Sequence, residues 1–319
     1  MKILITGVAG FIGFSIASKL LQNKKILVYG IDNFDNYYSI KYKKKRLSQI
    51  NKKKKFYFQN LDIRNKSKLF KMFKKNNFDV VMHFAAQAGV RYSLINPKKY
   101  YDVNDKGFKN ILDAIIKIKP KKIIYASSSS VYGNTQKFPT GEKDNVKPNN
   151  IYARTKIKNE KLAKIYKKKY KLNICGIRFF TVYGEWGRPD MFLFKLIKSY
   201  KNNKYFYLNN YGEHKRDFTY IGDVVTILVK LLYLKKYNFN IANICNSKPM
   251  SIKEICENFR IKYNFNKIKL IKKHKADVLN THGNNKLIKK IVKYKKFTNF
   301  QHGFKKTINW YFKESINKF

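Results

Sequence analysis

The 319-residue sequence is poor in several residue types, and each shortage argues against a class of protein. Its three cysteines, Cys175, Cys245 and Cys256, lie far apart without disulfide or metal-ligand spacing, so we expect buried thiols in a reducing compartment. The five histidines also lack metal-ligand spacing, and His83 is expected to pack within a strand. No apolar run reaches the roughly 18 residues of a membrane span, and the first residues have no signal-peptide pattern. We therefore expect a soluble, cytoplasmic protein without membrane contact.

Acidic residues and arginine are also scarce. There are 19 Asp and Glu against 70 Lys and Arg, which gives a formal charge of +51, and only eight of the basic residues are arginine. A charge of this size is typical of proteins that bind nucleic acid or anionic surfaces. The lysines, however, are spread along the whole sequence, densely from Lys24 to Lys318, through every expected helix and loop. This spread favours solvated lysine-rich faces over one polyanion site, and we expect no specific nucleic-acid partner.

The first thirteen residues, MKILITGVAGFIG, show the strongest local pattern. An apolar strand over 3–5 is followed by Gly7, Gly10 and Gly13 and by a helical pattern over 11–21. Glycines at this spacing permit a tight turn that brings a pyrophosphate close to the helix N-terminus. Asp32 ends the next apolar run, where a carboxylate can bind the ribose hydroxyls and would repel a 2′-phosphate. The pattern predicts dinucleotide binding, with NAD favoured over NADP.

Strand-like runs and helical stretches alternate along the first 180 residues. This alternation predicts an α/β fold of Rossmann type, a doubly wound parallel sheet with helices on both faces. Ligands lie beyond the carboxyl ends of the strands in such sheets. We expect Asp62 and Ile63, then Phe84, Ala85, Ala86 and Gln87, and then the serines 127–130 to line the cofactor site. The predicted strands are 3–5, 26–31, 55–59, 80–84, 122–127 and 172–179, and the predicted helices 11–21, 66–75, 98–117 and 151–169.

Ser128, Tyr152 and Lys156 form the candidate catalytic group. Tyr152 and Lys156 are four residues apart on a predicted helix and so share one face. A tyrosine base near pH 7 needs a pKa about three units below its usual value near 10. We expect the Lys156 ammonium and a positively charged nicotinamide to supply that change. Ser128 would bind the substrate hydroxyl and align it with the ring.

The motifs GVAGFIG, IDNFDNYYSIKYKKKRL, AAQAGVRYS, YASSSSVYG, YARTK, RFFTVYGEWGRPDM and KRDFTYIGDVV resemble the extended short-chain dehydrogenase/reductase family. Within it they are most similar to UDP-glucuronate 4-epimerases, and the match runs from residue 1 to about residue 250. The resemblance implies a tightly held NAD, a UDP-sugar substrate and a homodimer. It also implies these cofactor contacts: Gly7, Gly10, Phe11, Ile12, Gly13, Asp32, Asn33, Lys43, Asp62, Ile63, Gln87, Asn104, Tyr152 and Lys156.

The same resemblance suggests how a sugar would be held. Thr181 and Arg188 would face a uronate carboxylate, and Arg216 would meet the UDP pyrophosphate. Ser129 and Ser130 stand where related dehydratases carry an Asp-Glu pair, which argues against dehydration. The resemblance implies further substrate contacts at Ser129, Arg91 and Asp277. Glu185 adds an unexplained acid near the expected mouth of the substrate site.

Two interleaved domains are expected. An NAD-binding domain would cover residues 1–180, with 217–248 returning to its sheet, and a smaller α/β UDP-sugar domain would cover 181–216 and 249–319. The favoured activity is C4 epimerisation of UDP-glucuronate through a 4-keto intermediate. Alternatives are an epimerase of UDP-N-acetylglucosamine or its uronic acid, a polyanion- or nucleic-acid-binding protein on a dehydrogenase scaffold, and a redox-sensing NAD(P) binder without catalysis.

Overall fold

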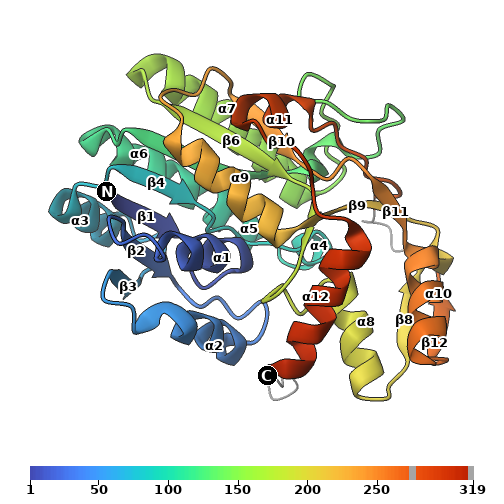
Figure 1. The fold of residues 1–319 in the computed structure, drawn as a ribbon. Helices are drawn as coiled ribbons and strands as arrows, with labels where there is room; N and C mark the ends of the chain where they lie inside the picture. The colour runs from blue at the N-terminus through green and yellow to red at the C-terminus, as the bar shows by residue number, and fades with distance from the viewer. Residues whose placement is uncertain (273–277, 315–319) are drawn as a thin grey trace.

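A parallel sheet with helices on both faces forms the centre of the molecule (Figure 1). The structure is a computed structural model that describes residues 1–272 and 278–314. Within these residues the sheet has seven strands in the order β10-β6-β5-β4-β1-β2-β3. The chain builds outward from β1 to β3 and then from β4 on the other side, as in a doubly wound sheet. The strands are β1 (Lys2–Thr6), β2 (Leu27–Asp32), β3 (Phe56–Asn60), β4 (Val80–His83), β5 (Lys122–Ser128), β6 (Ile174–Phe179) and β10 (Ile241–Ile244).

The central strands are mostly apolar because both faces of the sheet are covered. Ile3 and Ile5 pack on one face in a core shared with α1 (Phe11–Leu20), α2 (Ile40–Asn51) and α9 (Ile221–Tyr233). Leu4 points to the other face, where α3 (Lys66–Asn76), α6 (Phe108–Ile118) and α7 (Ile151–Tyr170) pack. This alternation of side chains confirms the predicted Rossmann-type fold.

Most of the later chain lies on one side of this sheet, at the lower right of Figure 1. One small sheet has the order β11-β9-β7, and β8 pairs in parallel with β12. The elements are β7 (Thr181–Tyr183), β8 (Phe206–Asn209), β9 (Lys215–Tyr220), β11 (Pro249–Ser251) and β12 (Ile268–Ile271), with α8 (Phe192–Lys201), α10 (Ile252–Tyr263), α11 (Lys286–Val292) and α12 (Phe300–Lys313). The helices α8, α10 and α12 pack around these small sheets, whereas α11 packs against β10 and α9.

Two predicted elements differ from the structure. The helix expected over 98–117 is divided into α5 (Pro97–Tyr100), the π-helical segment η1 (Tyr101–Gly107) and α6. The prediction that 217–234 returns to the central sheet is wrong. β9 joins the small sheet, and the apolar residues beyond β9 have helical spacing and form α9. The following strand β10 does join the central sheet, beside β6. The domain boundaries remain a prediction.

The remaining short elements connect these layers. They are α4 (Tyr92–Ile95) and the 3-10 turns η2 (Ser129–Tyr132) and η3 (Asn210–Gly212). All three cysteines are buried thiols, as expected. His83 is buried in β4, where its Nδ1 shares a 2.7 Å hydrogen bond with the Thr6 hydroxyl. Among the described residues, no helix is long and apolar enough to cross a membrane.

Candidate active site

The glycine turn after β1 is joined closely to its neighbours. The backbone N–H of Gly7 donates to the carbonyl of Ile31 at 2.8 Å, which fastens the turn to β2. Gly7 has a positive φ of 70°, and a Cβ added to Gly13 would overlap the Gly7 carbonyl. Gly10 caps α1 and has no side chain to cover the first N–H groups of that helix. These N–H groups at the helix start are the donor set that a pyrophosphate requires.

One cavity of about 430 Å³ lies at the carboxyl ends of the central strands. It is lined by the glycine turn, by residues that follow β2 to β6, and by residues of the 181–191 region and of β9. All predicted cofactor, catalytic and substrate residues line it, apart from Asn104, Arg91 and Asp277. The cavity therefore brings together predicted residues from Gly7 to Arg216, which are 209 positions apart in the sequence.

The three exceptions have different explanations. Asn104 is buried in η1 and lies behind the cavity wall: its side-chain oxygen accepts from the Gln87 N–H at 2.8 Å, and its amide donates to the Thr155 hydroxyl at 3.0 Å. It fixes the backbone after β4. The sequence analysis expected Asn104 to contact the cofactor, whereas in the structure Asn104 is not part of the cavity lining. Arg91 immediately precedes α4 and is half-buried outside the cavity lining. Asp277 lies outside the described residues.

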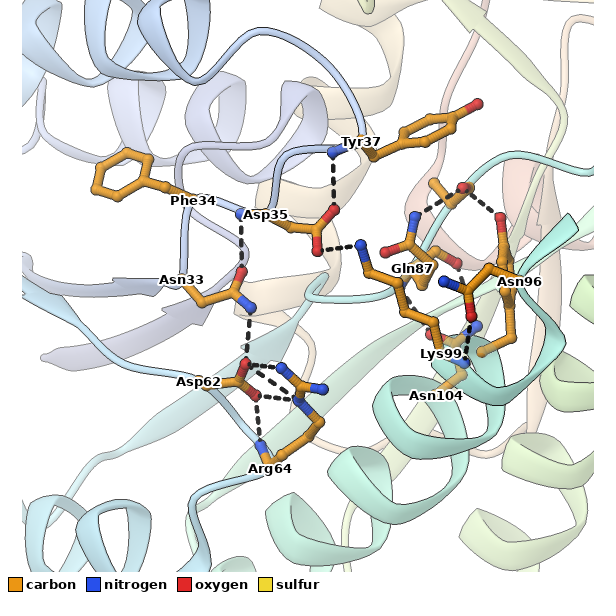
Figure 2. A network of polar contacts seen from close by, with 12 residues as sticks. Asn33, Phe34, Asp35, Tyr37, Asp62, Arg64, Gln87, Asn96, Lys99 and Asn104 are labelled. Atoms are coloured by element: carbon orange, nitrogen blue, oxygen red, sulfur yellow. Dashed lines mark hydrogen bonds and ion pairs between the residues drawn. The ribbon is translucent and has the colours of Figure 1, made fainter. Parts of the chain in front are cut away.

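Polar contacts connect the loops after β2 and β3 with each other and with α5 (Figure 2). Asn33 donates to Asp62 at 2.8 Å, and Arg64 forms a bidentate contact with the same carboxylate. Asp35 pairs with Lys99 at 2.7 Å. These contacts join the loops at the end of the cavity where the sequence predicts the adenosine of a dinucleotide.

Asp32 has the position expected of the ribose-binding acid. Its carboxylate lines the cavity and accepts hydrogen bonds from the backbone N–H groups of Ala9 at 3.1 Å and Phe34 at 2.8 Å. Burial raises the pKa of Asp32, whereas these N–H groups and the nearby Lys43 oppose the increase. Asp32 therefore connects the glycine turn to the loop after β2 while its side chain faces the cavity.

Tyr152 and Lys156 extend from α7 into the cavity beside the end of β5. The Lys156 ammonium donates to the carbonyl of Ala126 at 3.0 Å, and burial lowers the Lys156 pKa to about 8. Burial raises the pKa of Tyr152 above 10, although the Ser128 hydroxyl and the charge of Arg188 oppose this. The lowered tyrosine pKa expected from the sequence is thus not produced by the protein groups, because desolvation outweighs the nearby positive charge.

Arg188 enters the cavity as half of an ion pair. Its Nε and Nη2 donate to Asp190 at 3.0 and 2.5 Å, and the Tyr37 hydroxyl donates to the same carboxylate at 3.0 Å. Asp190 thus takes the Nε/Nη2 edge of the guanidinium, and the edge that includes Nη1 is the one that can meet a second carboxylate. Thr181, at the start of β7, lines the same cavity.

Two further residues of interest, Arg216 and Glu185, make contacts with distant parts of the chain. Arg216 on β9 lines the cavity and donates to the carbonyls of Val278 and Leu279. Glu185 was expected near the mouth of the cavity, but it is not part of the described cavity lining. Its carboxylate accepts a 2.8 Å hydrogen bond from the Tyr220 hydroxyl.

Sequence reasoning missed Tyr37, Arg46 and Asp190. All three lie in motifs that carry the family resemblance, so their positions were visible but their contacts were not. Within the described residues, no group of His, Cys, Asp and Glu side chains could hold a metal ion.

A family model described as the NAD-dependent epimerase/dehydratase family matches residues 3–245. The chain belongs to this family. It is therefore an NAD-dependent enzyme of the epimerase/dehydratase type, and the glycine turn, Asp32 and the uncapped start of α1 fit that cofactor.

Similar proteins cover nearly the whole chain. An uncharacterized protein of Methanocaldococcus jannaschii is 40% identical over 97% of this chain and 96% of its own length. UDP-glucuronate 4-epimerase 4 of Arabidopsis thaliana is 37% identical over 98% of this chain and 75% of its own length. The crystal structure of UDP-glucuronic acid 4-epimerase from Bacillus cereus, in complex with UDP-glucuronic acid and NAD, has a TM-score of 0.93 and 30% identity, covering 98% of this chain and all of that one.

Proposed function

We propose that this family member is a UDP-sugar 4-epimerase whose substrate is UDP-glucuronate and whose product is UDP-galacturonate. The observation that carries the proposal is that Thr181 and Arg188 line the same cavity as Ser128, Tyr152 and Lys156. A carboxylate-binding pair and an acid-base group thus share one site. The Arabidopsis and Bacillus cereus relatives named for this activity support the substrate.

The acid-base residues suit a reversible oxidation at C4. NAD, when bound, would accept the hydride of C4 and return it to the opposite face of the sugar, so the reaction has no net oxidation. Tyr152 would take the proton of the 4-hydroxyl and later give it back, while Ser128 orients that hydroxyl. Burial raises the Tyr152 pKa, and the Lys156 ammonium and the positive nicotinamide ring would both favour the phenolate form that acts as the base.

The carboxylate adds a second requirement. The 4-keto form of a glucuronate is a β-keto acid, which loses carbon dioxide readily. Arg188, oriented by Asp190, would hold the carboxylate through its remaining edge and keep its negative charge in place. Arg216 would face the diphosphate of UDP from the other side of the cavity.

The reaction is tested by incubating the purified protein with UDP-glucuronate and separating the products by chromatography with mass detection. UDP-galacturonate is expected as the main product. The 4-keto pentose that forms when the intermediate loses carbon dioxide should stay a minor species. Turnover of UDP-N-acetylglucosamine or its uronic acid without any UDP-galacturonate would reject the assigned substrate. A homodimer is proposed from the resemblance, and size-exclusion chromatography with light scattering measures it.

A further inference from the structure

Residues 37–46, called here the bridging segment, contact residues 184–190, called here the arginine loop. The hydroxyl of Tyr37 donates to the Asp190 carboxylate, and the hydroxyl of Tyr42 donates to the carbonyl of Gly187, each at 3.0 Å. Arg46 Nη2 donates to the carbonyl of Trp186 at 2.7 Å. The bridging segment also carries Lys43, which lines the predicted cofactor end of the cavity. The segment therefore touches both halves of the site.

Arg46 makes the most direct connection between these halves. It is wholly buried, and its Nη1 donates to the carbonyl of Ala9, inside the glycine turn, at 2.6 Å. The guanidinium also lies over the ring of Tyr42 at 4.8 Å and bonds the Tyr38 hydroxyl at 3.0 Å. The planar guanidinium thus binds a carbonyl of the glycine turn through Nη1 and a carbonyl of the arginine loop through Nη2. A lysine has one nitrogen and cannot reproduce this pair of directions.

The arginine loop needs such support because its backbone is strained. Trp186 has a φ of 59°, in the left-handed region that a bulky aromatic residue rarely adopts. Its ring is packed against Trp310 at 5.0 Å and Phe14 at 5.7 Å, and its carbonyl is the group that Arg46 binds. Arg188 follows two residues later. The direction in which Arg188 enters the cavity therefore depends on a conformation that Arg46 helps to hold.

We propose that Arg46 is a positioning residue that couples the two ligand sites, so that NAD on the glycine turn and a UDP-sugar beside the arginine loop strengthen each other's binding. The proposal depends on the proposed function for the identity of the second ligand. Fixing the Ala9 carbonyl from the cofactor side fixes the guanidinium, and the guanidinium fixes the Trp186 carbonyl. By thermodynamic linkage, the UDP-sugar must then stabilise bound NAD by the same factor.

The test measures how fast the purified holoenzyme releases NAD into buffer, with and without saturating UDP-glucuronate, whose carboxylate is the group that the arginine loop would hold. In the unmodified protein UDP-glucuronate should slow the release about tenfold, within the usual range of coupling between sites. Arg46→Lys keeps the charge but loses the fork, and the effect of UDP-glucuronate should fall to less than about twofold. The control is Arg260→Lys, a partly exposed residue paired with Glu257, which should keep the unmodified ratio.

A second variant removes dependence on how well Arg46→Lys folds. Tyr42→Phe deletes only the hydroxyl that binds Gly187 and should reduce the effect of UDP-glucuronate about threefold, as one neutral hydrogen bond predicts. The proposal is overturned if UDP-glucuronate does not slow NAD release from the unmodified protein, or if a folded Arg46→Lys, or Tyr42→Phe where Arg46→Lys does not fold, keeps the full effect. Failure of the proposed function has another signature, namely normal coupling by UDP-glucuronate without its conversion to UDP-galacturonate.

Discussion

The ammonium nitrogen of Lys156 lies 5.8 Å from the centre of the Tyr152 ring, one helical turn away on α7. Its hydrogen bond to the Ala126 carbonyl fixes that position from the end of β5. The pair therefore places a positive charge beside a buried phenol at the edge of the cavity. Burial makes both charged forms costly, since the Lys156 pKa falls to about 8 and the Tyr152 pKa rises above 10.

Tyr152→Phe should remove the acid-base group and leave the rest of the site intact. We expect kcat for epimerisation to fall about 10²- to 10⁴-fold, the usual contribution of a general acid-base group. The NAD content after purification, measured by absorbance, should be unchanged. More than a tenth of the original kcat in this variant would show that another group transfers the proton.

The pH dependence of the rate should reflect Lys156. Its folded pKa of about 8 means that the ammonium is charged below pH 8 and neutral above it. If that charge assists Tyr152, kcat should decline as the pH rises through about 8. A rate profile measured from pH 6 to 10 that stays flat to pH 10 would contradict this role.

Lys156→Met should separate stability from activity. The folded pKa lies below the ordinary value of 10.5, so the stabilising contribution of this group is present above pH 10.5 and is lost as the pH falls through 8. At pH 7 the buried charge therefore destabilises the fold by up to roughly 3 kcal/mol. Lys156→Met should melt at a higher temperature than the unmodified protein and have little activity, whereas an equal loss of both would favour a purely structural lysine.

Gly13→Ala and Gly141→Ala form a matched pair for the glycine turn. A methyl group at Gly13 would overlap the Gly7 carbonyl, whereas one at Gly141 would have its nearest neighbour at 3.7 Å. Gly13→Ala should purify with little NAD and melt several degrees lower, while Gly141→Ala should resemble the unmodified protein. NAD at full occupancy in Gly13→Ala would show that the close packing of this turn is not needed to hold the cofactor.

Arg188→Lys tests how the substrate is selected. Loss of the bidentate contact with a carboxylate should raise KM for UDP-glucuronate about 10- to 100-fold, which corresponds to roughly 1.5 to 3 kcal/mol for a charged hydrogen bond. UDP-glucose has no carboxylate, so its KM or inhibition constant should change little and serves as the internal control. Equal losses with both sugars would assign Arg188 a general structural role.

Local features of this site could be predicted from the sequence, and long-range ones could not. Gly7, Gly10 and Gly13 are recognisable because one turn requires all three at fixed spacing, and Tyr152 and Lys156 because a helix places them on one face. Arg46 is different. Its contact with Trp186 joins residues 140 positions apart, and nothing in either local pattern indicates it.

The same distinction applies where the structure differs from the prediction. Asn104 was assigned to the cofactor from the resemblance alone; that contact stays a prediction, and the Asn104 side chain binds the Gln87 N–H and the Thr155 hydroxyl. In the segment 217–234, the apolar residues beyond β9 have helical spacing and form α9, and the partner of β9 in the small sheet is set by tertiary packing. The Tyr152 pKa depends on how deeply the phenol is buried, which is a property of the whole fold.

The most direct test of the account uses UDP-glucuronate that carries deuterium at C4. If NAD on the glycine turn takes that atom and returns it to the same carbon while Tyr152 exchanges only the hydroxyl proton, the product UDP-galacturonate should keep the deuterium at C4. Mass spectrometry and proton NMR of the product measure this. UDP-galacturonate that has lost its deuterium to solvent would contradict the central claim.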